Sequence, residues 1–412
     1  MDTITLKEYD SLFVKERRDA KHNIISQDDA DALLSILRDG ESIFKWGYKR
    51  ITAQHWVGVI SLKDLTIEIL PKLASYCDTD QLRNVLTRML LVSHQMPNSK
   101  EVPGNIQTQK NSLIEILIST FLGALEKYIL GGLQHSYQKI SKNINYLKGK
   151  ILINKQFSKN ILKPDKFWCR FSKFTSDNPI NQFFKLCLRS MFEVTAVLQN
   201  KKRIECMLPL FEEMKNISKA TALSNTVVFN STNHRAEYAY QYGKLFLQNL
   251  YSTLNAGNIR MNSMLFDMNS LYETFIYKSA KAIYHSQIAY QQRGSYALVR
   301  DQDGRKYIAL RPDLTLKRGT GKIDIIDTKW KIPSNFAKES DIYQMNTYSI
   351  SIPGVDRVIL LYPFANSNNI VGDYHFADKN GNERKLNIRT IDLLKCLNWT
   401  SFLYELEIAL TN

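Results

Sequence analysis

Several features that would assign a sequence to a well-known class are missing from this chain of 412 residues. It contains neither GxxxxGKS/T nor GxGxxG, so we expect no nucleotide phosphate to be bound through either kind of loop. Its five cysteines are scattered and include no CxxC pair, which argues against a zinc or iron–sulfur site and indicates reduced thiols in a cytosol. The amino terminus has no basic segment followed by an apolar one, so no signal peptide is predicted.

Long apolar runs are also scarce. The most apolar stretch, LIEILISTFLGALEKYILGGL (113–133), is interrupted by Glu115, Glu126 and Lys127. Three charges in one such stretch favour a core helix over a membrane span. We therefore expect a cytoplasmic protein without membrane association.

Acidic residues are fewer than basic ones. The chain has 55 Lys and Arg against 40 Asp and Glu, a net charge of +15. This surplus favours a polyanionic partner, of which nucleic acid is the simplest. The hydrophobic content of 44% and the charged content of 23% are those of a folded globular protein rather than a disordered one.

The periodicity of the chain predicts an α+β multidomain protein with three domains. Residues 1–76 are expected to be strand-rich, with a hairpin of HWVGVISL and LTIEILP after a helix that starts at Ser26. Residues 77–262 are expected to be mainly helical, with a basic hairpin region and one helix starting at Asn178-Pro179. Residues 263–412 are expected to form an α/β domain. Its predicted order is a helix (269–286), a three-strand meander with turns at DQDG and around Thr320, a helix (337–350), the strand VDRVILLYP and a terminal helix (391–409).

The basic hairpin region covers residues 139–173. Its basic residues are Lys139, Lys142, Lys148, Lys150, Lys155, Lys159, Lys163, Lys166, Arg170 and Lys173, against the single acid Asp165, with Tyr146, Phe157, Phe167, Trp168 and Phe171 interleaved. Cations interleaved with aromatic rings suit contact with a nucleic acid or a protein partner, and we assign this contact to Lys148, Lys150, Lys155, Lys159, Lys163 and Lys166. The alternative is a solvated basic face. A projecting hairpin around NINYLKGKILIN (143–154) is the expected contact element.

The stretch RPDLTLKRGTGKIDIIDTKWK (311–331) places two aspartates and a lysine on an otherwise apolar hairpin. If its turn centres on Thr320, the cross-strand pairs are 317/323, 315/325 and 313/327. This register places Asp313 opposite Asp327, with Lys329 on the same face of the strand as Asp327.

Opposed like charges destabilise a sheet, and a bound divalent cation removes the conflict. Two carboxylates at cross-strand distance would form half of a Mg²⁺ coordination shell. Lys329 would then orient an attacking water or neutralise charge on a phosphodiester. The alternative is a surface hairpin with solvated charges, but IDII is too apolar for an exposed edge.

Pro312-Asp313 followed by Asp327-Thr328-Lys329 resembles the PD-(D/E)xK nuclease signature, and the predicted element order agrees with an α/β nuclease domain of that superfamily. The resemblance implies that Asp313, Asp327 and the Thr328 carbonyl bind Mg²⁺ and that Lys329 serves the water. Glu273, on the preceding helix, would be a further catalytic acid, or the Glu of a capping box with Ser270. Gln344 and Tyr348, one helical turn apart, would contact DNA phosphate or Lys329, or form a polar stripe.

The chain resembles the McrC family more closely, through VGVISLKDLTIEILPK, YLKGKI, SDNPINQFFK, FDMNSLYETF, LRPDLTL, IIDTKWK, YQMNTYS and LLYP in this order. The resemblance implies the nuclease subunit of a modified-cytosine restriction system that works with an McrB-like AAA+ GTPase ring. GTP would bind to that partner, whose hydrolysis this chain would stimulate. The target would be double-stranded, methylated DNA. Residues 1–76 are an extension relative to some family members, and no role is assigned to them.

These observations predict a Mg²⁺-dependent DNA endonuclease subunit of a GTP-dependent restriction complex. One rival is a non-enzymatic adaptor that only activates an AAA+ ring. Another is a stand-alone RecB-like repair nuclease, which would cut DNA without a GTPase partner.

Overall fold

The computed structural model describes residues 2–34, 36–38, 41–62, 64–73, 77–96, 112–231, 233–254, 260–299, 301–302, 305–319, 321–333, 336–364, 370–377 and 383–411. Backbone contacts divide the chain into two compact units. Unit 1 is Met1–Ile114 with Leu250–Asn412, and unit 2 is Glu115–Asn249. The α+β prediction is confirmed, whereas this division differs from the three predicted domains. The predicted boundary after residue 76 lies outside the described residues, and the one after 262 falls within strand β14 (Arg260–Asp267).

The N-terminal sheet of unit 1 joins strands from distant parts of the sequence. Its order is β1-β9-β8-β14-β13, formed by β1 (Asp2–Lys7), β9 (Leu65–Leu70), β8 (Trp56–Ser61), β14 and β13 (Leu250–Leu254). The predicted hairpin is present as antiparallel β8 and β9. Gly58 permits the close approach of β8 to β14, because its φ is +136° and a Cβ there would lie 2.0 Å from the Met264 carbonyl oxygen.

A smaller sheet shares the core of the N-terminal sheet. Its order is β3-β2-β7-β6, formed by β3 (Ile24–Ile25), β2 (Ser11–Val14), β7 (Arg50–Ala53) and β6 (Phe44–Gly47), beside the pair β4 (Leu37–Arg38) and β5 (Glu41–Ser42). Helix α1 (Gln27–Leu34) follows Ser26, whose Oγ accepts from the Asp29 N–H at 3.2 Å, as the predicted helix start requires. Leu12, Leu33 and Ile67 belong to one apolar cluster. The described part of the first 73 residues is therefore strand-rich, as predicted.

Two helices connect the N-terminal sheet with the rest of unit 1. Helix α2 (Thr79–Ser93) packs against α9 (Met268–Tyr284) and the 3-10 turn η6 (Leu393–Leu397). Asp78 and Gln81 form a reciprocal capping box at the start of α2.

The C-terminal sheet of unit 1 has six strands in the order β15-β18-β19-β20-β22-β21. They are β15 (Ile288–Tyr290), β18 (Leu314–Lys317), β19 (Ile323–Thr328), β20 (Val355–Pro363), β22 (Arg384–Ile391) and β21 (Gly372–Phe376). Strands β19, β20 and β22 run parallel, whereas β18 is antiparallel to β19.

The predicted three-strand meander is wrong in its connections. β15 pairs directly with β18, and the hairpin of β16 (Tyr296–Val299) and β17 (Lys306–Ala309) is inserted between them as a separate sheet. The first two strands of the predicted meander are therefore each divided into two short strands, β15 with β16 and β17 with β18. Asp303 and Gly304 of the predicted DQDG turn lie outside the described residues. The terminal helix α11 (Trp399–Thr411) begins later than predicted, because residues 393–397 form the 3-10 turn η6 after the unpredicted strand β22.

Helices cover both faces of the C-terminal sheet. Helix α10 (Glu339–Ser351) places Met345 and Tyr348 in one apolar cluster with Ile325 and Leu360 of the sheet. The opposite face of β19 meets α11, because Arg318 Nε binds Asp324 of β19 at 2.7 Å while its Nη2 binds the Leu410 carbonyl oxygen at 2.8 Å. Core side chains thus lie on both sides of β19, which explains its nearly continuous apolar sequence.

Unit 2 is mainly helical, as predicted for this region. Its helices are α3 (Leu113–Leu130), α4 (Ile153–Asn160), α5 (Pro179–Val194), α6 (Leu198–Met207), α7 (Lys219–Ser224) and α8 (Glu237–Asn249). Asn178 caps α5 through Ile180 N and Asn181 N, as predicted. Buried Glu115 of α3 accepts hydrogen bonds from Thr195 Oγ1, Ala196 N and Asn200 Nδ2, which accounts for an acid in an apolar helix. None of the helices in the described part of the chain combines the length and apolar character needed to cross a bilayer.

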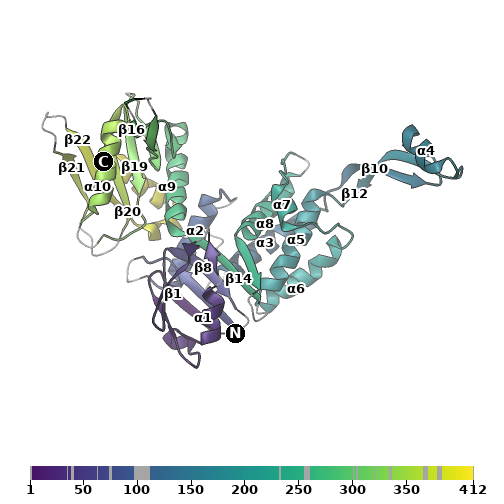
Figure 1. Cartoon of the computed structure of the whole chain (residues 1–412), viewed down its shortest axis with the longest axis horizontal. Helices are drawn as coiled ribbons and strands as arrows, with labels where there is room; N and C mark the ends of the chain where they lie inside the picture. Colours follow the sequence, from purple (N-terminus) through teal and green to yellow (C-terminus); the bar gives the residue numbers. More distant parts are fainter. Residues whose placement is uncertain are drawn as a thin grey trace. The chain divides into compact units, whose positions relative to one another are not determined.

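An arm, residues 136–175, extends away from the helices of unit 2 (Figure 1). Its sheet order is β10-β12-β11, formed by β10 (Ser136–Ile144), β12 (Phe167–Thr175) and β11 (Lys150–Ile151). The prediction of a projecting element is confirmed, but its pairing differs. The NINYLKGKILIN stretch is not a hairpin on its own, because both β10 and β11 pair with β12.

Candidate active site

The ends of β18 and β19 bring Asp313 and Asp327 together. The strands pair Thr315 with Ile325, and Leu314 with Ile326. Continuing this antiparallel register by one residue sets Asp313 opposite Asp327. The predicted register is therefore confirmed for 315/325 and 317/323. Thr320, on which the predicted turn centres, lies outside the described residues.

Asp327 is completely buried, and neither of its carboxylate oxygens makes a hydrogen bond of normal geometry. It forms an ion pair with Lys329 Nζ. Burial and repulsion by Asp313 raise the pKa of Asp327 to about 7, although Lys329 opposes this shift. A buried carboxylate with so few donors has unused capacity for a proton or a cation.

Thr328 holds the second carboxylate in place. Asp313 Oδ2 accepts from Thr328 N at 2.7 Å and from Thr328 Oγ1 at 2.9 Å. Burial raises the pKa of Asp313, and the two bonds from Thr328 oppose the rise. Asp313 is thus oriented by backbone and hydroxyl donors that follow directly after Asp327.

Lys329 lies at one end of a chain of hydrogen bonds from α10. Its Nζ donates to Gln344 Oε1 at 3.1 Å, Gln344 Nε2 donates to Tyr348 Oη at 2.8 Å, and Tyr348 Oη donates to the Arg311 carbonyl at 3.2 Å. Gln344 contacts the lysine directly and Tyr348 contacts it through Gln344, whereas contact with DNA phosphate stays a prediction. Burial lowers the pKa of Lys329, but attraction by Asp327 outweighs it and the pKa is raised. The side chain is therefore held as an ammonium beside the carboxylates.

Glu273 also faces this region. Its Oε1 accepts from Gln291 Nε2 at 2.6 Å, and burial together with repulsion by Asp313 raises its pKa. The capping-box alternative is wrong, because α9 starts at Met268 and its cap is Asp267, which accepts from Asn269 N and Ser270 N. Ser270 already lies in the first turn of the helix.

Two further residues of the site have no counterpart in the sequence prediction. The Gln291 N–H donates to the Asp313 carbonyl oxygen at 2.8 Å, and Gln291 Oε1 contacts Arg311 Nη2. Gln291 has a φ of +45° just after the short strand β15, a conformation that no periodic pattern reveals. Arg311 could have been noticed as the cation next to Pro312-Asp313.

The residues that could hold a metal ion are a pair of acids rather than a larger cluster. Among the described residues, no group of three or more His, Cys, Asp and Glu side chains is arranged to hold a metal ion. Mg²⁺ is commonly held by one or two carboxylates, with water and substrate phosphate completing its shell. The two carboxylate oxygens of Asp327, which accept no hydrogen bond of normal geometry and lie opposite Asp313, fit this mode of Mg²⁺ binding.

The six lysines assigned to DNA or partner contact belong to unit 2, whereas the carboxylates belong to unit 1. Lys150 lies on β11, Lys155 and Lys159 lie on α4, and the others flank these elements. Lys148 and Lys155 lie over the Phe171 and Trp168 rings, at 4.8 and 5.2 Å from the ring centroids. Of the six, all but half-buried Lys166 are exposed.

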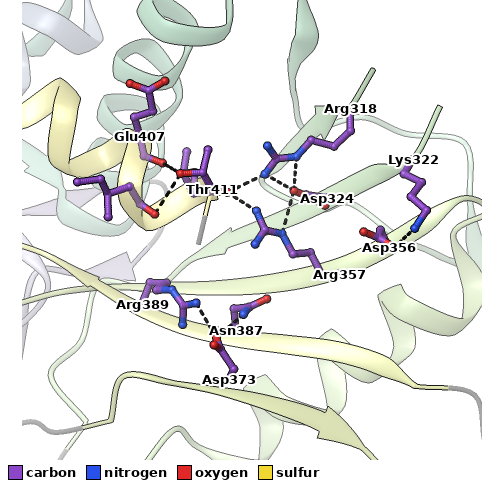
Figure 2. Close-up of polar contacts among 12 residues, drawn as sticks. Arg318, Lys322, Asp324, Asp356, Arg357, Asp373, Asn387, Arg389, Glu407 and Thr411 are labelled. Carbon is purple, nitrogen blue, oxygen red and sulfur yellow. Dashed lines mark hydrogen bonds and ion pairs between the residues drawn. The ribbon is translucent and has the colours of Figure 1, made fainter. Parts of the chain in front are cut away.

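A second charged cluster lies on the opposite face of β19 (Figure 2). Arg318 and Arg357 both bind buried Asp324, and Arg389 binds Asp373 beside a cleft of about 560 Å³. Side chains alternate along a strand, so Asp324 points away from Asp327. Since these charges are already paired, the cluster anchors the end of α11 rather than adding to the site.

Comparison with known proteins identifies the family of the chain. A family model described as McrBC 5-methylcytosine restriction system component matches residues 51–363, a range that includes all the site residues named above. No curated protein matches the sequence.

Two solved structures share the fold. One is a chain of a Thermococcus gammatolerans assembly of McrB AAA+ hexamers with bound McrC, with 19% identity, a TM-score of 0.68 and coverage of 98% of this chain and 99% of that chain. The other is from the Thermococcus gammatolerans McrBC complex, with 22% identity, a TM-score of 0.50 and coverage of 68% and 87%. The family match extends over more than half of the sequence, and the chain belongs to the family of McrBC 5-methylcytosine restriction system components.

Proposed function

We propose that this chain is the Mg²⁺-dependent DNA endonuclease subunit of a GTP-dependent restriction complex, and that Asp313, Asp327 and Lys329 form its cutting site. The main support is the carboxylate of Asp327, which is fully buried, forms an ion pair with Lys329 and lies opposite a second carboxylate. Two buried carboxylates beside one ammonium leave an excess of negative charge, which a bound divalent cation would offset.

Asp313, Asp327 and Lys329 correspond to the residues of the PD-(D/E)xK nuclease signature. Asp313 and Asp327, with the Thr328 carbonyl, would hold Mg²⁺, and Glu273 would lie at the edge of the site. When bound, the ion would stabilise the negative charge that develops on the phosphate group.

Lys329 would orient the attacking water and offset charge on the phosphodiester oxygens. Its ammonium is directed by Gln344 on one side and by Asp327 on the other. Tyr348 fixes Gln344 against the backbone of Arg311. The chain thus supplies a fixed cation next to two fixed acids, the arrangement that hydrolysis of a phosphodiester requires.

The similar fold from an assembly of McrB AAA+ hexamers with bound McrC supports the same kind of partner here. We propose that an AAA+ GTPase ring binds the arm and that its GTP hydrolysis is stimulated by this contact. Large apolar side chains are exposed at the arm's tip, among them Leu147, Phe157 and Leu162. Exposed apolar side chains next to lysines are typical of a protein-binding surface. We propose that the complex binds double-stranded, methylated DNA: the net charge of +15 supports contact with a polyanion, and the family description as a 5-methylcytosine restriction system component supports the methylated base.

The deciding experiment is cleavage of a methylated plasmid in Mg²⁺ and GTP by wild type and Asp327→Ala, each with and without the cognate AAA+ GTPase. We expect cleavage only with wild type and partner together. Asp327→Ala should still stimulate GTP hydrolysis, which would show that the variant is folded. An adaptor would stimulate hydrolysis without cutting, and a stand-alone nuclease would cut without the partner.

A further inference from the structure

Glu8 is a buried acid that the proposed reaction does not use. It follows strand β1 of the N-terminal sheet and is completely buried. One of its oxygens accepts from the Lys72 N–H at 3.0 Å. Burial raises the pKa of Glu8 to about 7, so the fold retains this acid in spite of an unfavourable environment.

The side-chain partner of Glu8 is Trp330, the residue directly after Lys329. Trp330 Nε1 lies 3.0 Å from both carboxylate oxygens of Glu8, in a contact between residues 322 positions apart in the sequence. The indole also lies beside the Tyr272 ring, at a centroid distance of 5.4 Å. Tyr272 directly precedes Glu273. Trp330 therefore lies between the N-terminal sheet and the helix that presents Glu273.

The N-terminal sheet also holds the start of that helix. The His55 carbonyl, just before β8, accepts from Met268 N at 2.9 Å, and His55 Nε2 lies 3.7 Å from the capping residue Asp267. Asp267 in turn acts on Glu8 electrostatically. Glu8 and His55, which flank strands of the N-terminal sheet, thus contact the two segments that contain Lys329 and Glu273.

We propose that Glu8 is a positioning residue of the nuclease site, which holds Lys329 through the hydrogen bond to Trp330. This inference rests on the proposed function. It assigns the described N-terminal residues a task in the cutting step rather than in DNA or partner recognition. A buried bond to the adjacent residue restricts the backbone of Lys329, and small misplacements of catalytic groups have large effects on rate.

The test uses the complete chain with its GTPase partner and compares kcat and KM for plasmid cleavage. Trp330→Phe removes the indole donor and keeps a ring against Tyr272, and Glu8→Leu removes both acceptors. Each should lower kcat about tenfold and leave KM for DNA within about twofold. The conservative variant Glu8→Gln keeps an acceptor and should retain most of the rate. The double variant should be no worse than Glu8→Leu alone, because both changes break one interaction.

Glu68→Leu is the matched control. Glu68 lies in strand β9 of the N-terminal sheet and is as buried as Glu8, and its described hydrogen bonds go to Arg83 and Thr5 rather than to Trp330. It should lower the melting temperature as much as Glu8→Leu does and leave kcat unchanged. GTPase stimulation should be unchanged in all four single variants.

A second measurement separates this inference from the proposed function. Amide hydrogen exchange at residues 327–331 should be faster in Glu8→Leu than in Glu68→Leu. If wild type never cuts DNA, the proposed function fails, and the exchange data still decide whether Glu8 restrains this segment. Unchanged exchange, an unchanged kcat in Trp330→Phe, or an equal loss of kcat in Glu68→Leu would each overturn the positioning role.

Discussion

At the scale of single residues, the chemistry of the site depends on burial. Asp327 is an acid whose pKa is raised to about 7 because it is buried and faces Asp313. Below that pH its folded state holds a proton, and a proton competes with a metal ion for the same oxygens. Acidity should therefore weaken Mg²⁺ binding at a pH where an exposed aspartate would already be ionised.

We predict that the Mg²⁺ concentration for half-maximal cleavage falls as the pH rises from 6 toward 8. The change should be largest below about pH 7 and approach tenfold per pH unit, because metal binding must displace one proton. Mg²⁺ titrations of plasmid cleavage at fixed ionic strength measure it. A half-maximal concentration independent of pH would contradict a role for Asp327 as a ligand.

The bonds from α10 lead to a second prediction at this scale. Tyr348→Phe removes the hydroxyl that joins Gln344 to the Arg311 carbonyl, so Lys329 should lose part of its orientation. We expect kcat to fall about fivefold, against at least a hundredfold for Lys329→Ala. Tyr343→Phe is the control on the same helix, because Tyr343 is 67% exposed, and it should have no effect. Equal rates in the two tyrosine variants would argue against the role of this hydrogen-bond chain.

Sequence reasoning located the residues of the hairpin because side-chain alternation fixes which of them face each other. It located Asp313, Asp327 and Lys329 without knowledge of the remaining fold. It missed Gln291, whose position depends on a left-handed turn, and one of its two alternatives for Glu273 was a capping box at Ser270, where Asp267 caps the helix instead. Local hydrogen bonds of this kind depend on where a helix starts, which sequence patterns give only approximately.

At the scale of elements, two hairpins between neighbouring segments were predicted, whereas the pairings between distant segments were not. The β8–β9 hairpin and the β18–β19 hairpin follow from alternating apolar residues beside a short turn. The pairing of β8 with β14 joins segments about 200 residues apart, and the sequence of neither segment indicates which strand it pairs with. For this reason the predicted domain boundary after residue 262 cuts through β14.

We predict that Gly58→Ala destabilises unit 1 through this long-range pairing. The new Cβ would meet the Met264 carbonyl oxygen at 2.0 Å at a φ unsuited to alanine. The expected loss is about 2–4 kcal/mol of unfolding free energy, measured by urea titration. Gly319→Ala is the matched control, because a Cβ added there would have no other atom within 4 Å and the φ of Gly319 is not positive. It should change stability by less than about 0.5 kcal/mol.

At the scale of the whole molecule, cutting and partner contact are assigned to different units. The carboxylates belong to unit 1 and the arm to unit 2. The two proposed activities should therefore be separable by changes that leave the other unit folded.

We predict that shortening the arm abolishes GTPase stimulation without unfolding the chain. Ile144 of β10 pairs with Phe167 of β12, so residues 145–166 can be replaced by an Asn-Gly turn while the ladder is kept. The melting temperature should be unchanged. As a comparison, Lys155, Lys159 and Lys163 can be changed together to Gln, which tests charge without removing the apolar tip. Full stimulation by the shortened chain would rule out the arm as the contact.

The position of unit 2 in the sequence, between β8 and β14, also matters while the protein is being made. The edge of β8 that pairs with β14 has no partner until the ribosome has added about 200 more residues. At ordinary translation speeds this takes about 10–40 s, during which an apolar strand edge is open to wrong pairing. Unit 2 is synthesised complete within that interval, so it can fold first, and newly made chains are expected to need a chaperone until β14 emerges.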